Sequence, residues 1–318
     1  MSDLKRPLVS VVVCTYNQEQ WIRQTLDSIL NQKTDYPFEI VIGEDCGTDG
    51  TRKICEEYVR KYSNVQLVDQ NRNLGVTANW VNCVKHSSGE YLMCCAGDDY
   101  WHNPNKIQLQ VDYMESHPEC VVCHSDINEL NCVTGKCIES CKKKKGKPIL
   151  QGRIQKELLL GKVDVSAVTL CLRKTYIDKY IPLEKYVELQ FPREDWPTLL
   201  ILSAYGTIDY LPESTATYRV GQESITRDSN YDRIRLRLQK DKVMTEFLYS
   251  MFPEWGPFKD GPWFDNIVYH QMMLAAYRND DYKSAHEFAK KDVYRTKATY
   301  MAYTYPTFKL YRKLYLKR

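Results

Sequence analysis

The sequence predicts an α/β fold, with a Rossmann-like, mostly parallel central sheet and a helical C-terminal region appended to it. Three observations support this prediction. Short β-branched apolar runs lack the alternation of a half-solvated strand, amphipathic helical stripes separate those runs, and the pattern after Asn230 is helical. Continuous apolar strands are typical of parallel sheets that helices cover on both faces. The expected class is therefore a doubly wound α/β domain followed by helices.

The first strand and the first helix establish the alternation. Residues 8–14 form an apolar, β-branched run that predicts a buried strand. One helical stripe follows, made of Trp21, Ile22, Thr25, Leu26, Ile29 and Leu30. Asn17 is expected to cap the first turn of this helix, because its amide oxygen can accept a hydrogen bond from an exposed backbone N–H.

The same alternation continues through residue 124. Strands are expected at residues 38–42, 65–68, 91–95 and 120–124, and helices at residues 51–62, 76–85 and 106–115. Because crossovers between parallel strands are right-handed, the carboxyl ends of these strands meet at one edge of the sheet. Functional residues of such sheets gather in the loops at that edge.

The pattern is less regular after residue 130. Residues 131–152 are rich in Cys, Lys and Gly and predict an irregular excursion, in which lysines 142–145 and 147 form a solvated loop. The sequence pattern again predicts regular elements after this stretch. They are an apolar segment at 168–172, a helix at 196–204 and two short strands at 208–211 and 216–220. The expected domains are residues 1–228 and a helical region at residues 229–318.

Composition excludes several classes of protein. The chain has 318 residues, of which 43% are hydrophobic and 27% charged, so it is neither disordered nor collagen-like nor a disulfide-stapled miniprotein. The net charge of +3 gives no reason to expect a nucleic-acid partner. No apolar run is long enough for a membrane-spanning helix, and the N-terminus lacks the apolar segment of a signal peptide. We therefore expect a cytoplasmic protein whose 12 cysteines are reduced thiols.

Carboxylates follow two of the expected strands. Asp45 ends the second strand, where it can accept N–H groups of a nucleobase or ribose hydroxyls, whereas Asp49 in the same loop is better explained as a helix cap. Asp98 and Asp99 follow the fourth strand, with no Lys or Arg in the segment to pair them. Adjacent carboxylates raise each other's pKa, and a Mg²⁺ or Mn²⁺ ion, ligated further by substrate phosphates, relieves their repulsion. The alternative is a solvated turn that caps the next helix.

Four segments are informative as an ordered set. They are Val9-Ser10-Val11-Val12-Val13 with Thr15-Tyr16-Asn17, Glu44-Asp45 with Gly47 and Asp49, Asn71-Arg72-Asn73-Leu74-Gly75, and Gly97-Asp98-Asp99-Tyr100-Trp101. Together they resemble the inverting family-2 glycosyltransferases of the GT-A fold, over roughly the first 220 residues. The resemblance implies an enzyme that moves a sugar from a nucleotide-diphosphate donor, UDP-linked by preference, to an acceptor hydroxyl. Such enzymes commonly build bacterial surface polysaccharides such as O-antigen or capsule, on saccharide or lipid-linked acceptors.

The resemblance also implies roles for individual residues. The expected nucleotide-binding residues are Thr15, Tyr16, Asn17, Asp45, Asn71, Asn73, Asn79 and Asp98. Asp98 and Asp99 are the expected ligands of a divalent metal, with no distinction between them. Asn71 and Asn73 are explained equally well as turn residues.

Two positions depart from the family's pattern. Ala96 stands where many relatives carry an acid two residues before Asp98, so the metal is expected to bind more weakly or with different ligands. Gly221 stands where a His often approaches the metal or diphosphate. Arg219 remains as the candidate contact to the diphosphate, with an ion pair at the edge of the core as its alternative.

The reaction needs a general base. An inverting displacement at an anomeric carbon requires a group that takes the acceptor proton and another that neutralises the departing diphosphate. Residues 191–197 resemble the family segment that carries the catalytic Asp, which assigns the base to Asp195. A helix N-terminus favours the ionised carboxylate there. Glu194 is the alternative base, in which case Asp195 only caps the helix.

Two other features have both a structural and a functional interpretation. Cys120, Cys123 and His124 could belong to a zinc site, but the spacing to the downstream cysteines is wrong for familiar fingers, and both thiols fall on a buried strand where Cys fills space. Residues 293–318 contain no acid and interleave Lys and Arg with aromatic and apolar residues. This basic segment is expected to contact anionic lipid on the inner face of the plasma membrane, with a packed helix as the alternative.

Two other functions fit parts of the sequence. A sugar nucleotidyltransferase also uses an α/β sheet, a nucleotide and Mg²⁺, but it normally has a Gly-rich basic loop after the first strand, where this chain has Thr15-Tyr16-Asn17-Gln18. The second alternative is a catalytically inactive protein that binds a nucleotide sugar or acts as a scaffold. It remains an alternative because Ala96 and Gly221 replace residues that are typical of the active family members. A dehydrogenase is excluded, because no G-x-G-x-x-G follows the first strand.

Overall fold

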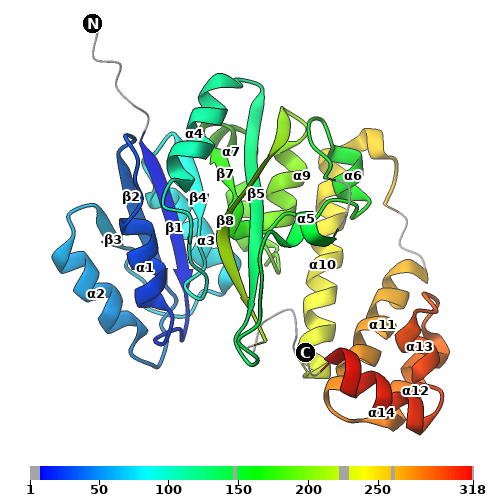
Figure 1. The fold of residues 1–318 in the computed structure, drawn as a ribbon. Coiled ribbons are helices and arrows are strands. Elements are labelled where there is room, and N and C mark those ends of the chain that lie inside the picture. The colour runs from blue at the N-terminus through cyan, green and yellow to red at the C-terminus, as the bar shows by residue number, and fades with distance from the viewer. Residues whose placement is uncertain (1–7, 146–148, 222–228, 259–261, 317–318) are drawn as a thin grey trace, which may run out of the picture. The chain divides into compact units, whose positions relative to one another are not determined.

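The structure is a computed structural model that describes residues 8–145, 149–221, 229–258 and 262–316 (Figure 1). The backbone forms two units. The first contains the residues up to Leu130 together with Gly135–Val220, and the second contains Asn131–Thr134 and the residues from Gly221 onward. None of the helices in the described ranges combines the length and the apolar character that crossing a bilayer requires.

One eight-stranded sheet organises the first unit, in the order β3-β2-β1-β4-β7-β5-β6, with β8 paired to β5 (Figure 1). Its parallel part consists of β1 (Val9–Thr15), β2 (Phe38–Glu44), β3 (Val65–Leu67) and β4 (Tyr91–Cys94). Its antiparallel part adds β7 (Cys171–Arg173), β5 (Cys120–Asn131) and β6 (Cys137–Ile138). The mostly parallel α/β sheet is therefore confirmed, and it turns antiparallel beyond β4.

Helices alternate with the parallel strands as predicted. They are α1 (Ile22–Leu30), α2 (Thr51–Lys61), α3 (Val76–His86) and α4 (Lys106–Ser116). The prediction that Asn17 caps α1 is wrong, because the residue that precedes the helix is Trp21. Asn17 instead adopts a left-handed φ of 53° in the loop before it. Its amide oxygen accepts a hydrogen bond from the backbone N–H of Thr48, in the loop after β2.

The C-terminal half of the first unit contains shorter helices and one long strand. The helices are α5 (Cys141–Lys145), α6 (Gln155–Leu159), α7 (Lys174–Tyr180), α8 (Leu183–Glu188) and α9 (Asp195–Leu202), with a 3₁₀ turn η1 (Ala167–Thr169). The two strands expected at 208–211 and 216–220 form a single strand, β8 (Thr207–Val220). This strand contains Pro212, which is tolerated because β8 lies off the main path of the sheet.

The lysine run is not the solvated loop that charge alone predicted. Residues 141–145 form α5, and the Nζ of Lys142 lies 3.3 Å from Nδ1 of His124 on β5. Lys142 is drawn inward because its carbon chain covers apolar surface while its ammonium reaches a polar partner. Lys143 and Lys144 are exposed, and Lys147 lies outside the described residues.

The core of the first unit is continuous across both faces of the central strands. Val9, Val11 and Val13 of β1 are fully buried, and Val12, on the opposite face, is 1% exposed. Burial of successive residues explains why this strand lacks alternation, because helices cover both faces of the sheet (Figure 1). The sheet is therefore a rigid base for the loops at its edge.

From Tyr231 onward the described part of the second unit is helical, as predicted. It contains α10 (Tyr231–Met251), η3 (Pro253–Trp255), α11 (Pro262–Arg278), α12 (Tyr282–Lys291), α13 (Lys297–Met301), α14 (Tyr305–Tyr311) and a π-helical turn η4 (Arg312–Leu316). Asn230 caps α10, because its side chain accepts hydrogen bonds from two backbone N–H groups of the first turn. Tyr277 and Phe308 stack at 4.7 Å within a small apolar core.

Candidate active site

The carboxyl ends of β1, β2 and β4 bring two acidic loops to one edge of the sheet. The backbone N–H of Asp45, directly after β2, donates to the carbonyl of Thr15 at 3.0 Å. The backbone N–H of Gly97, after β4, donates to the carbonyl of Cys14 at 2.9 Å. Because β1 lies between β2 and β4, the two loops flank the end of β1.

Asp45 fixes the loop that precedes α3. Its buried carboxylate accepts hydrogen bonds from the backbone N–H groups of Leu74 at 2.6 Å and Gly75 at 2.9 Å. The side chain of Asn73 donates to the Asp45 carbonyl at 2.9 Å. Asn71 is exposed on the same loop. The structure therefore brings Asp45 and Asn73 together, with the Asp45 carboxylate at the N-terminus of a helix, where negative charge is favoured.

Asn79 lies beneath this loop rather than on its surface. The side chain is 2% exposed, and its amide nitrogen donates to the carbonyl of Gly43 at 2.8 Å. Its amide oxygen accepts from Gln70 at 3.1 Å. A Cβ at Gly43 would lie 2.1 Å from that oxygen, so only glycine allows α3 to pack this closely on β2. Asn79 therefore connects the end of β2 to α3.

Hydrogen bonds also join the loops after β1 and β2. The backbone N–H of Thr48 donates to Asn17 Oδ1 at 2.7 Å. Asp49 accepts from the backbone N–H of Thr51 at 2.9 Å, but the N-cap residue of α2 is Gly50, so the prediction that Asp49 caps this helix is wrong. Burial raises the pKa of Asp49, but the hydrogen bonds from Thr51 outweigh that effect and hold the pKa below its ordinary value. Beside Asn17, Tyr16 is 47% exposed and is the aromatic side chain that this edge presents to solvent.

Asp99 is buried under the turn that carries Asp98. Its carboxylate accepts a 2.9 Å hydrogen bond from the backbone N–H of Arg219 on β8. Burial and then the adjacent charge of Asp98 raise the pKa of Asp99 well above its ordinary value. Asp98 is half-buried, and its carbonyl accepts a hydrogen bond from Arg219 Nη1. The carboxylate pair and Arg219 therefore form one cluster.

The guanidinium of Arg219 is held between two aromatic rings. Its central carbon lies 4.4 Å from the ring centroid of Trp21 and 4.8 Å from that of Tyr100. Nη2 donates to the amide oxygen of Gln24. The side chain is only 3% exposed, and Nε has no hydrogen-bond partner among the described residues. Stacking on two rings fixes this positive charge in place.

The acid pair fits a divalent cation only with help from a ligand. Among the described residues, no three His, Cys, Asp or Glu side chains form a group able to hold a metal ion. Asp98 and Asp99 offer hard oxygen ligands, the type that Mg²⁺ and Mn²⁺ prefer. Burial is the larger cause of the raised pKa of Asp99, and a bound cation would offset both that burial and the repulsion from Asp98.

Glu194 and Asp195 lie at the start of α9, beside the end of β4. Both line a small cavity with Cys94, the last residue of β4. Asp195 Oδ1 accepts from the backbone N–H of Trp196 at 2.7 Å. Burial and then the charge of Asp195 raise the pKa of Glu194 to about 8. The structure therefore brings both base candidates to the edge that carries the acid loops.

The electrostatics of Cys14 agree with this arrangement. A hydrogen bond with Cys83 and burial raise the pKa of Cys14 at the end of β1, and the charge of Glu194 adds to the rise.

Cys120 and Cys123 are buried on β5, where burial is the main cause of their raised pKa values. Both thiols belong to the apolar core cluster, which agrees with their interpretation as space-filling residues.

Three residues of the Arg219 cluster were not expected from the sequence: Trp21, Gln24 and Tyr100. The sequence placed Trp21 on the apolar stripe of α1 and Tyr100 in the acidic motif. The antiparallel bridge between Tyr100 and Thr217 joins Tyr100 to the strand that carries Arg219. Trp21 and Gln24 contact the Arg219 side chain separately, from the N-terminal part of the chain. No local spacing contains that information, although an aromatic residue next to an acid pair could have been examined as a cation contact.

An α/β sheet that is parallel through β4 and antiparallel beyond it, with acidic loops after β2 and β4, defines a domain of the GT-A glycosyltransferase class. The sequence model of glycosyl transferase family 2 matches residues 10–159. The chain belongs to this family and is a glycosyltransferase.

Curated relatives are similar to parts of the chain. The uncharacterized protein Rv1520 of Mycobacterium tuberculosis is 30% identical over 251 residues, which cover 76% of this chain and 67% of the relative. The putative teichuronic acid biosynthesis glycosyltransferase TuaG of Bacillus subtilis is 31% identical over 109 residues, 34% of this chain and 42% of the relative.

Solved structures share the fold. S. aureus TarS in complex with UDP-GlcNAc superposes with a TM-score of 0.51 at 20% identity, covering 96% of this chain and 89% of that chain. The mannosyltransferase PcManGT of Pyrobaculum calidifontis, in complex with GDP-Man and Mn²⁺, gives a TM-score of 0.50 at 14% identity, covering 98% and 84%. At these identities the likeness concerns the fold alone.

Proposed function

We propose that the chain transfers a sugar from a nucleotide-diphosphate donor, UDP-linked by preference, to a hydroxyl of a saccharide or lipid-linked saccharide, with inversion. The observation that carries this proposal is the meeting of three acidic elements at one sheet edge. The Asp45 loop and the Asp98–Asp99 turn flank the end of β1, and Asp195 shares a cavity with the end of β4. The likeness to TuaG supports a place in surface polysaccharide synthesis.

The donor site divides into contact and support residues. Tyr16, Asn17 and Asn71 are accessible from solvent to some degree, and we assign them to the nucleoside, with Asp98 at the ribose and diphosphate. Thr15, Asp45 and Asn79 are buried, and they hold the loops that carry these contacts. Arg219 supplies the fixed positive charge for the diphosphate. The nucleotide-sugar complexes of TarS and PcManGT support this class of donor.

We assign a divalent cation, Mn²⁺ or Mg²⁺, to Asp98 and Asp99 together with the donor phosphates. When bound, such an ion neutralises charge on the departing diphosphate. The Mn²⁺ in the PcManGT complex supports the choice of ion. Arg219 lies next to the same acids, so the chain contributes a second positive charge of its own.

Asp195 is the proposed general base. The acceptor hydroxyl attacks the anomeric carbon while the bond from that carbon to the diphosphate breaks, and the hydroxyl proton passes to the Asp195 carboxylate. Glu194 is less suited to this role, because a pKa of about 8 keeps it protonated at neutral pH. Its proposed role is to shape the cavity beside the base.

A thermal-shift screen tests the proposal. The purified chain is heated with UDP, GDP, dTDP and CDP sugars, with and without Mn²⁺. We expect UDP sugars with Mn²⁺ to raise the Tm most, since a ligand that binds only the folded state stabilises it. An inactive binding protein would show the shift without releasing UDP from the sugar. The absence of a shift with every nucleotide sugar would refute the proposal.

We also propose cytoplasmic localisation with peripheral contact to anionic membrane through residues 293–318. In the described part of this segment, Phe308 is buried and ties α14 to the helical core. Leu310, Leu314 and Tyr315 are between 42% and 48% exposed, and they alternate with basic residues. A surface that combines exposed apolar and basic side chains is typical of helices that lie on anionic lipid.

A further inference from the structure

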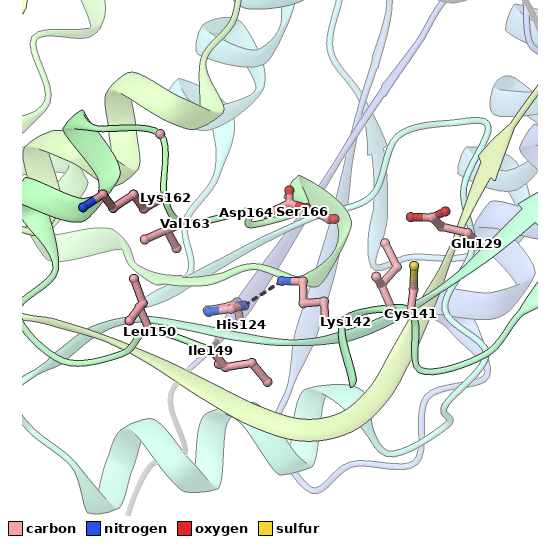
Figure 2. A pocket seen from close by; sticks show the side chains of 12 residues that line it. His124, Glu129, Cys141, Lys142, Ile149, Leu150, Lys162, Val163, Asp164 and Ser166 are labelled. Atoms are coloured by element: carbon pink, nitrogen blue, oxygen red, sulfur yellow. Dashed lines mark hydrogen bonds between the residues drawn. The ribbon is translucent and has the colours of Figure 1, made fainter. Parts of the chain in front are cut away.

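A second pocket lies between β5, α5 and the segment that leads into η1 (Figure 2). Its empty volume is about 700 Å³, part of which is open solvent. Its polar lining includes His124 and Glu129 from β5, Lys142 from α5, and Asp164 and Ser166 from the segment before η1. None of the described residues that line it belongs to the donor edge, so this pocket is a separate feature of the first unit.

His124 and Lys142 form the polar centre of the pocket (Figure 2). His124 is 2% exposed, and its Nδ1 lies 3.3 Å from Lys142 Nζ. Burial and then the charge of Lys142 hold the pKa of His124 well below its ordinary value, so the imidazole is neutral. Burial lowers the pKa of Lys142 to about 8, which leaves the ammonium protonated at neutral pH. Because an ammonium only donates, we assign the ring hydrogen of His124 to Nε2.

The Nε2 atom of His124 is a donor without an acceptor. It is buried, and it has no hydrogen-bond partner among the described residues. A buried N–H that has lost its water without gaining a partner destabilises the protein, and in native structures such a group calls for an explanation. A hydroxyl or ether oxygen of a ligand in the pocket would satisfy it.

The remaining lining supplies acceptors and apolar surface. Asp164 and Ser166 lie on one side of the His124–Lys142 pair in Figure 2, and Ile149 and Leu150 lie on the other. Sugar rings present hydroxyl groups around their rim and C–H groups on their faces, so they need both kinds of contact. The pocket offers donors, acceptors and apolar side chains together.

We propose that this pocket binds a neutral saccharide unit of the acceptor. The inference rests on the proposed glycosyl transfer and names the acceptor's chemical class. Ser166 lines this pocket, and its neighbour Ala167 lines the cavity that contains Glu194 and Asp195. Adjacent residues of one segment therefore line the two cavities, and this is why we assign the saccharide to the acceptor.

The charges around the pocket favour a neutral ligand over an anionic one. Lys142 and Lys162 supply positive charge. Asp164 and Glu129 line the same pocket, and the charges of Asp164 and the buried Asp126 act on Lys142. A carboxylate or phosphate group would meet these acids, whereas hydroxyl groups can both donate to them and accept from Lys142.

Saturation-transfer NMR titrations of the full chain test the inference. The probes are methyl glycosides of glucose, galactose, mannose and N-acetylglucosamine, with methyl glucuronide and glucose 1-phosphate as anionic probes. We expect a neutral glycoside to bind, and Val163→Trp, which fills the pocket from a half-buried position, to raise its Kd at least roughly tenfold. His124→Phe should raise the Kd by about tenfold, since it removes one buried donor.

Lys144→Met is the matched control, because Lys144 is exposed on the same helix and does not line the pocket. It should change the Kd less than about twofold. If circular dichroism shows that His124→Phe is not folded, the affinity of Val163→Trp alone tests the inference. Unchanged affinity in the pocket variants, a preference for the anionic probes, or no binding of any neutral glycoside would overturn the inference.

The titration needs no turnover, so it separates the inference from the proposed function. A protein that binds the glycoside in this pocket but never transfers a sugar refutes the glycosyl transfer, while the pocket remains a saccharide site. A protein that transfers a sugar with unchanged glycoside affinity in Val163→Trp refutes the inference alone.

Discussion

The backbone N–H of Arg219 donates a 2.9 Å hydrogen bond to the buried carboxylate of Asp99, 120 positions earlier in the chain. This bond attaches β8 to the acidic turn after β4, and the bridge between Tyr100 and Thr217 extends the attachment. The Arg219 side chain then lies between Trp21 and Tyr100. The turn that carries Asp98 and Asp99 is therefore held by residues from the end of the first unit, Thr217 and Arg219, and Arg219 is held in turn by Trp21 from its beginning.

Arg219→Lys should impair donor binding more than it impairs folding. An ammonium cannot stack on Trp21 and Tyr100 as a planar guanidinium does, nor can it reach the Asp98 carbonyl and Gln24 together. We expect the kcat/KM for the donor to fall at least roughly tenfold and stability to fall by about 1–2 kcal/mol. Steady-state kinetics and thermal melting measure the two effects.

Arg60→Lys is the control for this substitution, because Arg60 is exposed on α2. It should leave both quantities unchanged. Donor kinetics that are equal in Arg219→Lys and Arg60→Lys would show that Arg219 only packs the core.

Glu194 should make the protein less stable as the pH rises from 5 to 8. Its pKa is raised from 4.5 to about 8 by burial and then by the charge of Asp195. Between those values the folded state keeps a proton that the unfolded chain has released, so stability falls with increasing pH. Glu194→Gln removes this titration, and we expect its Tm at pH 8 to exceed that of the parent by roughly 3 °C, with a smaller difference at pH 5.

Glu90→Gln, at an exposed position, serves as the control for the pH series. Its Tm should follow that of the parent protein at every pH. Parallel pH profiles of the parent and Glu194→Gln would mean that Glu194 is not buried as a protonated acid.

The parallel half of the sheet was predictable from the sequence because its information is local. Unbroken apolar runs such as residues 8–14 indicate strands buried on both faces, and the amphipathic stripe after them indicates a covering helix. The edge that carries Asp45, Asp98 and Asp99 follows from that topology.

The antiparallel half was harder to predict, because its pairings join residues that are distant in the chain. The two short strands expected at 208–211 and 216–220 form one strand, β8, and the charge of Lys142 suggested solvent where the structure has a pocket. The Asn17 cap was wrong because a longer-range acceptor role toward Thr48 competes with local capping. Such choices depend on tertiary contacts that propensities do not contain.

Removal of divalent ions should slow the reaction strongly. Burial and then the charge of Asp98 raise the pKa of Asp99, a bound cation would favour its charged form, and no third protein ligand joins the two acids among the described residues. We expect excess chelator to reduce the rate at least roughly tenfold, and Mn²⁺ or Mg²⁺ to restore it. Undiminished turnover in chelator would show that the acid pair has another role.

The basic C-terminal segment should bind anionic vesicles. Lys309→Glu combined with Lys313→Glu reverses two charges beside the exposed Leu310 and Leu314. Each basic residue near an anionic surface contributes about 1 kcal/mol, so the partition coefficient in a flotation assay should fall at least roughly tenfold. Lys53→Glu combined with Lys61→Glu, on the exposed face of α2, is the control. Equal flotation of the two double variants would contradict a specific membrane contact.

The central claim is that this sheet edge binds a nucleotide sugar and that Asp195 takes the acceptor proton. The most direct measurement compares donor affinity and sugar transfer in the parent, Asp195→Asn and Glu194→Gln. We predict that Asp195→Asn binds the donor with unchanged affinity but loses at least roughly a hundredfold in kcat, while Glu194→Gln keeps most of the activity at pH 7. Full turnover in Asp195→Asn, or a parent protein that binds no nucleotide sugar, would contradict the account.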